Sequence, residues 1–181
     1  MKVGESVQID HMTLHFAGIE RLSEHVYANV FCKADSANAA EFLRELVENV
    51  PYKVCSIQVD GSSEFMKDFE HACKELSIPL FVLPLVKPTY NSKIERSNRT
   101  FREEFYAVLN EDSIVWERRE LVKFLQKHNS YRPHASLHGL TPLEYISNVY
   151  SWSLFGAHIC LNLDHTFLKH AGVFFEKNIC I

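Results

Sequence analysis

The sequence lacks long apolar segments. No run of about 18 apolar residues, the length that a membrane-spanning helix needs, occurs anywhere in the chain. The first ten residues, MKVGESVQID, contain no apolar core followed by a small-residue cleavage site. We therefore expect a cytoplasmic protein that has no membrane partner.

Closely spaced cysteines are also missing. The chain has five cysteines, an odd number, and they are scattered without any C-x-x-C pair: Cys32, Cys55, Cys73, Cys160 and Cys180. This usage favours reduced thiols over a disulfide framework or a zinc ribbon.

An overall positive charge is absent as well, because the formal net charge is −4. This charge argues against binding to nucleic acid through overall charge, so any contact with DNA has to come from a local basic patch. What the chain does have is a hydrophobic fraction of 46%, which is enough apolar material for one core of catalytic size.

Alternating apolar residues mark two early segments, 7–16 and 25–32. This pattern predicts two adjacent antiparallel strands, with Asp10 inside the first. From Ser36 onward the apolar residues recur at helical spacing until Pro51, with Ser36 as a candidate N-cap. We expect this helix to cover one face of a sheet.

The next segments alternate between strand and helix. Residues 54–59 predict a short strand that Asp60 and Gly61 end, residues 65–76 have helical spacing, and residues 79–85 predict another strand. Such a strand-helix-strand order favours parallel pairing. Asp60 then lies at the carboxyl end of a strand, where open α/β sheets commonly bind ligands.

A basic amphipathic helix is predicted after this unit. Ile94, Phe101, Phe105 and Val108 form an apolar stripe, and Glu95 lies on a neighbouring face at the rim of the core. Glu95 is the one acid among five basic residues of segment 87–102: Lys87, Lys93, Arg96, Arg99 and Arg102. A lone carboxylate among so many cations suggests a metal ion close to phosphates.

Two features carry a family resemblance. The first is the order strand-Asp10, strand-Asp60-Gly61, helix-Glu95, in which 34 residues (61–94) separate the last two acids. The second is an N-x-x-R-P-H…L…T-P-x-E element, made by Asn129, Arg132, Pro133, His134, Leu137, Thr141, Pro142 and Glu144. Over residues 7–146 the chain resembles the DDE-type integrase catalytic core of bacterial insertion-sequence transposases, which are related to retroviral integrases.

The resemblance implies an α/β, ribonuclease H-like mixed sheet flanked by helices. It also implies that Asp10, Asp60 and Glu95 are the catalytic residues and bind two Mg²⁺ or Mn²⁺ ions, for which hard oxygen ligands are suited. The implied reaction is DNA strand cleavage followed by strand transfer. Backbone phosphates would be bound by the basic residues, namely Lys87, Lys93, Arg96, Arg99 and Arg102.

The implied partners are DNA, as element ends and as target, and further copies of the chain in a homo-oligomer. No helix-turn-helix pattern precedes Asp10, so we expect a separate DNA-binding subunit. The predicted division is a catalytic core over residues 1–128, the family element over 129–150, and an atypical tail over 151–181. For the tail, zinc binding through its histidines and a frameshifted end both remain open.

Alternatives remain for the acids and for the function. Taken singly, Asp10 and Asp60 are typical of strand and turn positions, and Glu95 could simply pair with Arg99. Only two strands are expected before the first helix where relatives carry three, which leaves open the loss of one strand. A truncated, inactive remnant that retains DNA or subunit binding is therefore the second hypothesis. A ribonuclease H-like nuclease ranks last, because it does not explain the element that begins at Asn129.

Overall fold

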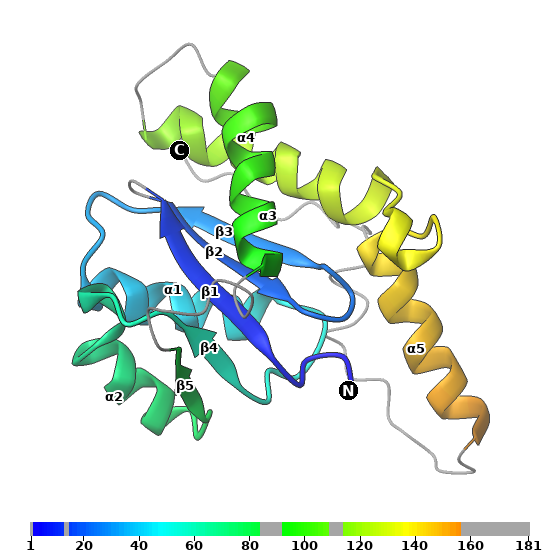
Figure 1. The fold of residues 1–181 in the computed structure, drawn as a ribbon, viewed down its shortest axis with the longest axis horizontal. Helices are drawn as coiled ribbons and strands as arrows, with labels where there is room; N and C mark the ends of the chain where they lie inside the picture. The colour runs from blue at the N-terminus through cyan, green and yellow to red at the C-terminus, as the bar shows by residue number, and fades with distance from the viewer. Residues whose placement is uncertain (1, 13–14, 84–91, 109–113, 157–181) are drawn as a thin grey trace, which may run out of the picture.

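A mixed five-stranded sheet forms the centre of the protein, with the strand order β3-β2-β1-β4-β5 (Figure 1). The computed structural model describes residues 2–12, 15–83, 92–108 and 114–156. β1, β2 and β3 form an antiparallel meander, and β4 and β5 continue the sheet in parallel with β1. The strands are β1 (Val7–Met12), β2 (His15–Glu20), β3 (Val26–Val30), β4 (Ile57–Val59) and β5 (Leu80–Val82).

Three strands, not two, precede the first helix, so the expectation of two strands is wrong. Met12 pairs with His15, and this pairing divides the alternating run 7–16 into β1 and β2. The sequence hides the reversal because segment 11–17 contains none of the usual turn residues Gly, Pro, Asn or Asp. Leu14, which belongs to the segment 7–16, lies outside the described residues.

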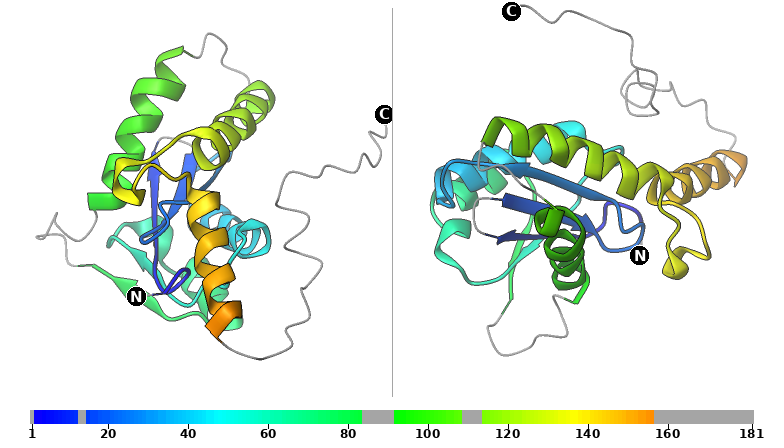
Figure 2. Two further views of the ribbon diagram at one scale, coloured as in Figure 1. Left: turned by 90° about the vertical axis from the view of Figure 1, so that its right-hand side faces the viewer. Right: turned by 90° about the horizontal axis from the view of Figure 1, so that it is seen from above.

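Helices cover both faces of the sheet (Figure 2). α1 and α2 pack together on one face, whereas α3 crosses β1 and β2 on the other and α4 packs against β3. α3 continues into a π-helical segment, Phe101–Phe105, and α4 into another, Lys127–Tyr131. The helices are α1 (Ser36–Asn49), α2 (Asp68–Glu75), α3 (Ser92–Thr100), α4 (Ile114–Gln126) and α5 (Pro142–Gly156). None of the helices described is long and apolar enough to cross a membrane.

The N-cap of α1 is Asp35, and the predicted cap Ser36 is the first helical residue. The Asp35 carboxylate accepts a hydrogen bond from the backbone N–H of Asn38 at 3.0 Å. This bond satisfies one of the free donors at the helix start. The hydroxyl of Ser36 instead donates to Asp68 at 2.7 Å and thereby links α1 to α2.

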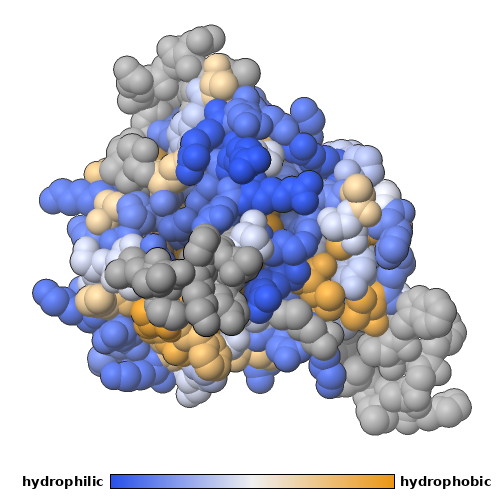
Figure 3. All heavy atoms as spheres, viewed as in Figure 1, coloured by the Kyte–Doolittle hydropathy of each residue, from blue (hydrophilic) through white to orange (hydrophobic). Residues whose placement is uncertain are grey.

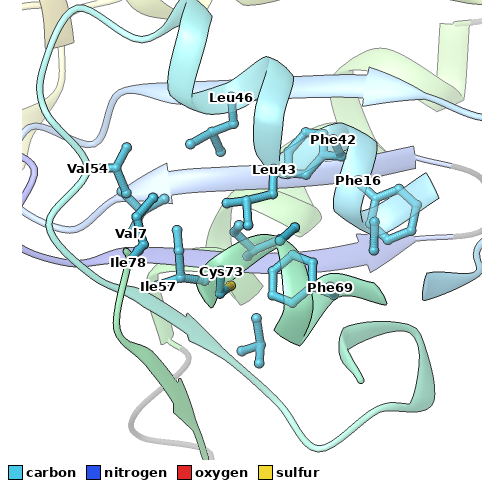
Figure 4. Packing of buried hydrophobic residues seen from close by; sticks show 14 of the residues in the cluster. Val7, Phe16, Phe42, Leu43, Leu46, Val54, Ile57, Phe69, Cys73 and Ile78 are labelled. Carbon is cyan, nitrogen blue, oxygen red and sulfur yellow. The ribbon is translucent and has the colours of Figure 1, made fainter. Parts of the chain in front are cut away.

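The larger apolar core lies between the sheet and the pair α1 and α2 (Figure 4). Phe16 and Phe42 are fully buried in it, with ring centroids 5.7 Å apart. Gly18 of β2 has no room for a side chain, because a Cβ there would overlap Leu46 of α1. The absence of that Cβ is what lets α1 lie close to the strand.

A second apolar cluster occupies the opposite face, under α3 and α4. Ile94, Phe101 and Phe105 are all buried there, so the stripe predicted from their spacing is confirmed. Val108, the fourth predicted member, has a side chain outside the described part of the structure. This packing fixes which side of α3 faces the sheet, and therefore which side chains are left at its flanks.

Candidate active site

Asp10 of β1 lies beside Asp60, the residue that follows the adjacent parallel strand β4. β1 and β4 pair with Val7 opposite Ile57 and Gln8 opposite Gln58. Continuing this register by two residues places Asp10 beside Asp60, which directly follows β4. Neighbouring strands are about 4.8 Å apart, and side chains paired across them share a face. The structure therefore brings the first two predicted acids together at one edge of the sheet.

The environment of Asp10 disfavours its negative charge. Burial is the main cause that raises the pKa of this carboxyl above its ordinary value, and the neighbouring charge of Asp60 also raises it. Hydrogen bonds from the backbone N–H of His11 and from the side-chain amide of Asn98, both 2.8 Å long, act in the opposite direction. A divalent cation shared by the two carboxylates would offset both the burial and the repulsion.

α3 is held along β1 by three evenly spaced contacts. The backbone N–H of Ile94 donates to Gln8 at 3.2 Å, Asn98 donates to Asp10, and Nε of Arg102 donates to Sδ of Met12 at 3.1 Å. The contacts recur every two residues along the strand, which is about 6.7 Å, and every four residues along the helix, which is about 6.0 Å. The matching repeats fix the register of α3 against the strand that carries Asp10.

Glu95 is exposed in the first turn of α3. It precedes Asn98 by three residues, and residues at this spacing lie on the same side of a helix. Within the described ranges, no three His, Cys, Asp or Glu side chains are grouped closely enough to hold a metal ion. The structure thus places Glu95 on the flank that faces the site but does not bring its carboxylate to Asp10 and Asp60.

The predicted DNA-binding residues divide between two flanks of α3. Arg99 and Arg102 are exposed at four and seven residues after Glu95, on its side of the helix. Lys93 instead pairs with Glu24, and Arg96 lines a pocket on the other flank. Lys87 lies outside the described residues.

Three residues that the sequence analysis did not single out support the two acids. Asn98 is 4% exposed and holds Asp10. The sequence could have indicated Asn98, because a polar residue four positions after Ile94 falls on the apolar side of α3 and needs a hydrogen-bond partner there. His11, next to Asp10, contacts Glu64 of the 3₁₀ turn Ser63–Phe65 that follows Asp60. No spacing in the sequence points to that pair.

Asn129, the first residue of the N-x-x-R-P-H element, binds the backbone of edge strand β3. Its side-chain oxygen accepts from the N–H of Val26 at 3.0 Å, and its amide nitrogen donates to the carbonyl of Val26 at 2.7 Å. Asn129 is buried, and its two bonds satisfy backbone groups on the side of edge strand β3 that has no neighbouring strand.

The variant Asn129→Ala is expected to lose about 2 kcal/mol of unfolding free energy, because both backbone groups of Val26 remain buried without partners. Urea unfolding monitored by circular dichroism measures the change. Asn49→Ala is the control, since Asn49 is exposed and its side-chain amide donates to the carbonyl of Glu45 in its own helix. Equal losses in the two variants would contradict this role for Asn129.

His134, in the same element, binds the buried carboxylate of Glu24. Its Nδ1 lies 3.1 Å from Glu24, which also contacts Lys93. The hydrogen bond from His134 is the largest of the causes that lower the pKa of Glu24 to about 2, and burial opposes it. The side-chain partner of His134 is therefore a carboxylate.

The lowered pKa gives the stability a defined pH dependence. Glu24 has a pKa of 4.5 when unperturbed, so its contribution to stability is complete above that pH and is lost as the pH falls toward about 2. Glu24→Gln is expected to be less stable than wild type at neutral pH. The difference in unfolding free energy between the two proteins should decrease steadily below the unperturbed pKa. Urea titrations across that range measure it. Glu75→Gln, which removes a half-exposed partner of Arg44, should show little gap at any pH.

The T-P-x-E part of the element is a helix start. The hydroxyl of Thr141 accepts from the N–H of Glu144, and the carboxylate of Glu144 accepts from the N–H of Thr141 at 2.8 Å. This reciprocal pair is a capping box, and Pro142 occupies the first position of α5. Ile146, one turn later, is buried in the larger core. The tail predicted from residue 151 is described only to residue 156.

Comparison with known proteins agrees with this architecture. Residues 78–142, which include Glu95 and most of the element, match the sequence family described as Integrase core domain. The fold is similar to the crystal structure of the catalytic core domain of BIV integrase, with a TM-score of 0.67 and 20% identity, over 83% of this chain and 99% of that chain. No curated protein matches the sequence. The family match and the shared ribonuclease H-like fold together support an integrase or transposase catalytic core.

Proposed function

We propose that the protein is a DDE-type polynucleotidyl transferase that cleaves DNA and transfers the cut strand in transposition or integration. The observation that carries the proposal is the parallel pairing of β1 and β4, which sets Asp10 beside Asp60. A pair of carboxylates in a half-buried position is a donor set suited to Mg²⁺ or Mn²⁺. Asp10, Asp60 and Glu95 would hold the metal, and Glu95 would reach it from the flank of α3.

The residues of the chain have distinct roles in this proposal. Bound divalent ions supply activation of the attacking oxygen and stabilisation of the leaving oxygen. Asn98 donates to one carboxylate oxygen of Asp10 and the backbone N–H of His11 donates to the other, so the carboxylate is held in place. Arg99 and Arg102, exposed beside Glu95, would bind the DNA phosphates without reading the base sequence. We further propose a cytoplasmic homo-oligomer with a separate DNA-binding subunit.

Metal binding is tested by the thermal unfolding of wild type and Asp60→Asn with and without Mn²⁺. At about 100 times the dissociation constant, Mn²⁺ should add about 2.7 kcal/mol of stability to wild type and much less to the variant. Glu41→Gln removes an exposed carboxylate of α1 and should respond like wild type. Identical melting of wild type with and without Mn²⁺ would contradict the proposal.

The second candidate is an inactive remnant of such an enzyme that retains DNA or subunit binding. It is favoured by one observation, the absence of a third acidic group beside Asp10 and Asp60 in the described residues. A remnant would show no Mn²⁺-dependent stabilisation while still binding DNA in the absence of metal. The same unfolding experiment, followed by a DNA-binding titration, therefore separates the two candidates.

A further inference from the structure

A pocket of about 150 Å³ lies on the flank of α3 that is turned away from Glu95. One wall comes from α3 and the other from the R-P-H segment of the family element. The side chains that matter are Lys93, Arg96 and Ser97 from α3, and Arg132, His134 and Ser136 from the segment.

The charges around this pocket favour an anion. Glu24 also lines it, but its carboxylate is already bound by Lys93 and His134. Arg96 is exposed. Its backbone carbonyl accepts from the hydroxyl of Thr100, whereas its guanidinium makes no hydrogen bond or ion pair with any residue that the structure describes. Arg132 uses one terminal nitrogen on Glu104 at 2.8 Å, which leaves donors of its fork available. Two guanidinium groups therefore remain for a ligand.

Two buried polar atoms of the pocket wall have no partner within the described residues. They are Oγ of Ser97, a residue 5% exposed, and Nε2 of His134. Buried polar atoms are rarely left without a partner in native proteins. His134 already presents Nδ1 to the carboxylate of Glu24, so Nε2 is the ring atom left for a ligand. The hydroxyl of Ser97 and the two guanidiniums together form a donor set for phosphate oxygens.

We propose that this pocket binds a phosphate group of the DNA backbone. The inference rests on the proposed function, because DNA is the source of that phosphate. The pocket lies on a different side of α3 from Arg99 and Arg102, so α3 would be contacted by DNA on both flanks. Figure 3 shows that the face carrying α3 is predominantly hydrophilic, as such a contact requires.

The first experiment titrates inorganic phosphate into the full chain in EDTA, at constant ionic strength in chloride, and follows heat release and thermal unfolding. Wild type should be stabilised by phosphate. Arg96→Gln should weaken phosphate binding about tenfold, and Ser97→Ala should weaken it several-fold without any change in charge. Arg119→Gln, an equal charge change at an exposed residue of α4 outside the pocket, should stay within about twofold. A wild type that responds alike to phosphate and chloride overturns the proposal.

The second experiment identifies the source of the phosphate. Binding of a fluorescent duplex of random sequence is measured in EDTA over a range of salt concentrations. Arg96→Gln should weaken binding and reduce the salt slope by about one, Ser97→Ala should weaken binding with the slope retained, and Arg119→Gln should change neither. The DNA proposal is overturned if wild type binds inorganic phosphate but both pocket variants bind DNA as tightly as wild type does. The pocket is then assigned to a free anion. Because no divalent metal is present, neither result depends on catalytic activity.

Discussion

Asp10→Asn is expected to abolish nicking of supercoiled DNA in the presence of Mn²⁺, with a loss of about 10³-fold. Removing one shared carboxylate takes away several kcal/mol of transition-state stabilisation, and each 1.36 kcal/mol corresponds to about tenfold in rate. The substitution keeps the size of the side chain, so loss of packing is not its cause. Conversion of supercoiled to open-circular plasmid, followed over time on agarose gels, measures the effect.

The same variant should lose little stability without metal. Burial and the charge of Asp60 both disfavour the Asp10 carboxylate, as the raised pKa of this group indicates. An amide removes that charge, which offsets the loss of one of the two hydrogen bonds that Asp10 accepts from His11 and Asn98. A large loss of activity with little loss of metal-free stability is the signature of a site built for a cation. Glu41→Gln should nick DNA at the wild-type rate. An Asp10→Asn variant that nicks DNA normally would rule out Asp10 as a metal ligand.

Phe16→Ala is expected to cost about 3–5 kcal/mol of unfolding free energy, the largest effect on stability that we predict. Phe16 is fully buried, and its ring lies 5.7 Å from those of Phe31 and Phe42 and 6.3 Å from that of Phe65. An alanine there leaves a cavity between β2 and α1. Guanidinium unfolding monitored by tryptophan fluorescence gives the change.

Phe16→Leu is the matched variant, because it keeps most of the apolar volume and should lose far less. Phe16 also pairs with His11 across the β1–β2 ladder, next to Asp10. Mn²⁺ binding by Phe16→Ala should therefore weaken along with its stability. A loss below about 1 kcal/mol would mean that the core can collapse around the missing ring.

Periodicity predicted most of the fold because each element buries one side. The apolar spacing of Ile94, Phe101 and Phe105 reflects which side of the helix is buried. The apolar residues of β4, which Asp60 follows, are likewise buried. The reversal between β1 and β2 was missed since no turn residue marks it. Pairing partners are set by tertiary contacts, and a run of alternating residues does not state where the chain folds back.

The candidate site was predictable in its residue types and only partly in its geometry. Sequence order placed Asp10 and Asp60 on strands, and their adjacency follows from the parallel register of β1 and β4. The division of Lys93 and Arg96 from Arg99 was not foreseen, because it depends on what packs against each side of α3. Lys93 is engaged by Glu24, which is 69 residues distant in the sequence. Contacts of that kind leave no local pattern.

The matched repeats of β1 and α3 restrict how the third acid can move. Sliding α3 by one residue would turn it by about 100° and break all three contacts with Gln8, Asp10 and Met12 at once. These contacts fix the position of α3 on the sheet, and Glu95 is a long, exposed side chain of this helix. We therefore expect Glu95 to approach its neighbours by rotation about its own χ angles, which in exposed residues takes picoseconds to nanoseconds. Metal capture would then be limited by the arrival of the ion and not by a rearrangement of the backbone.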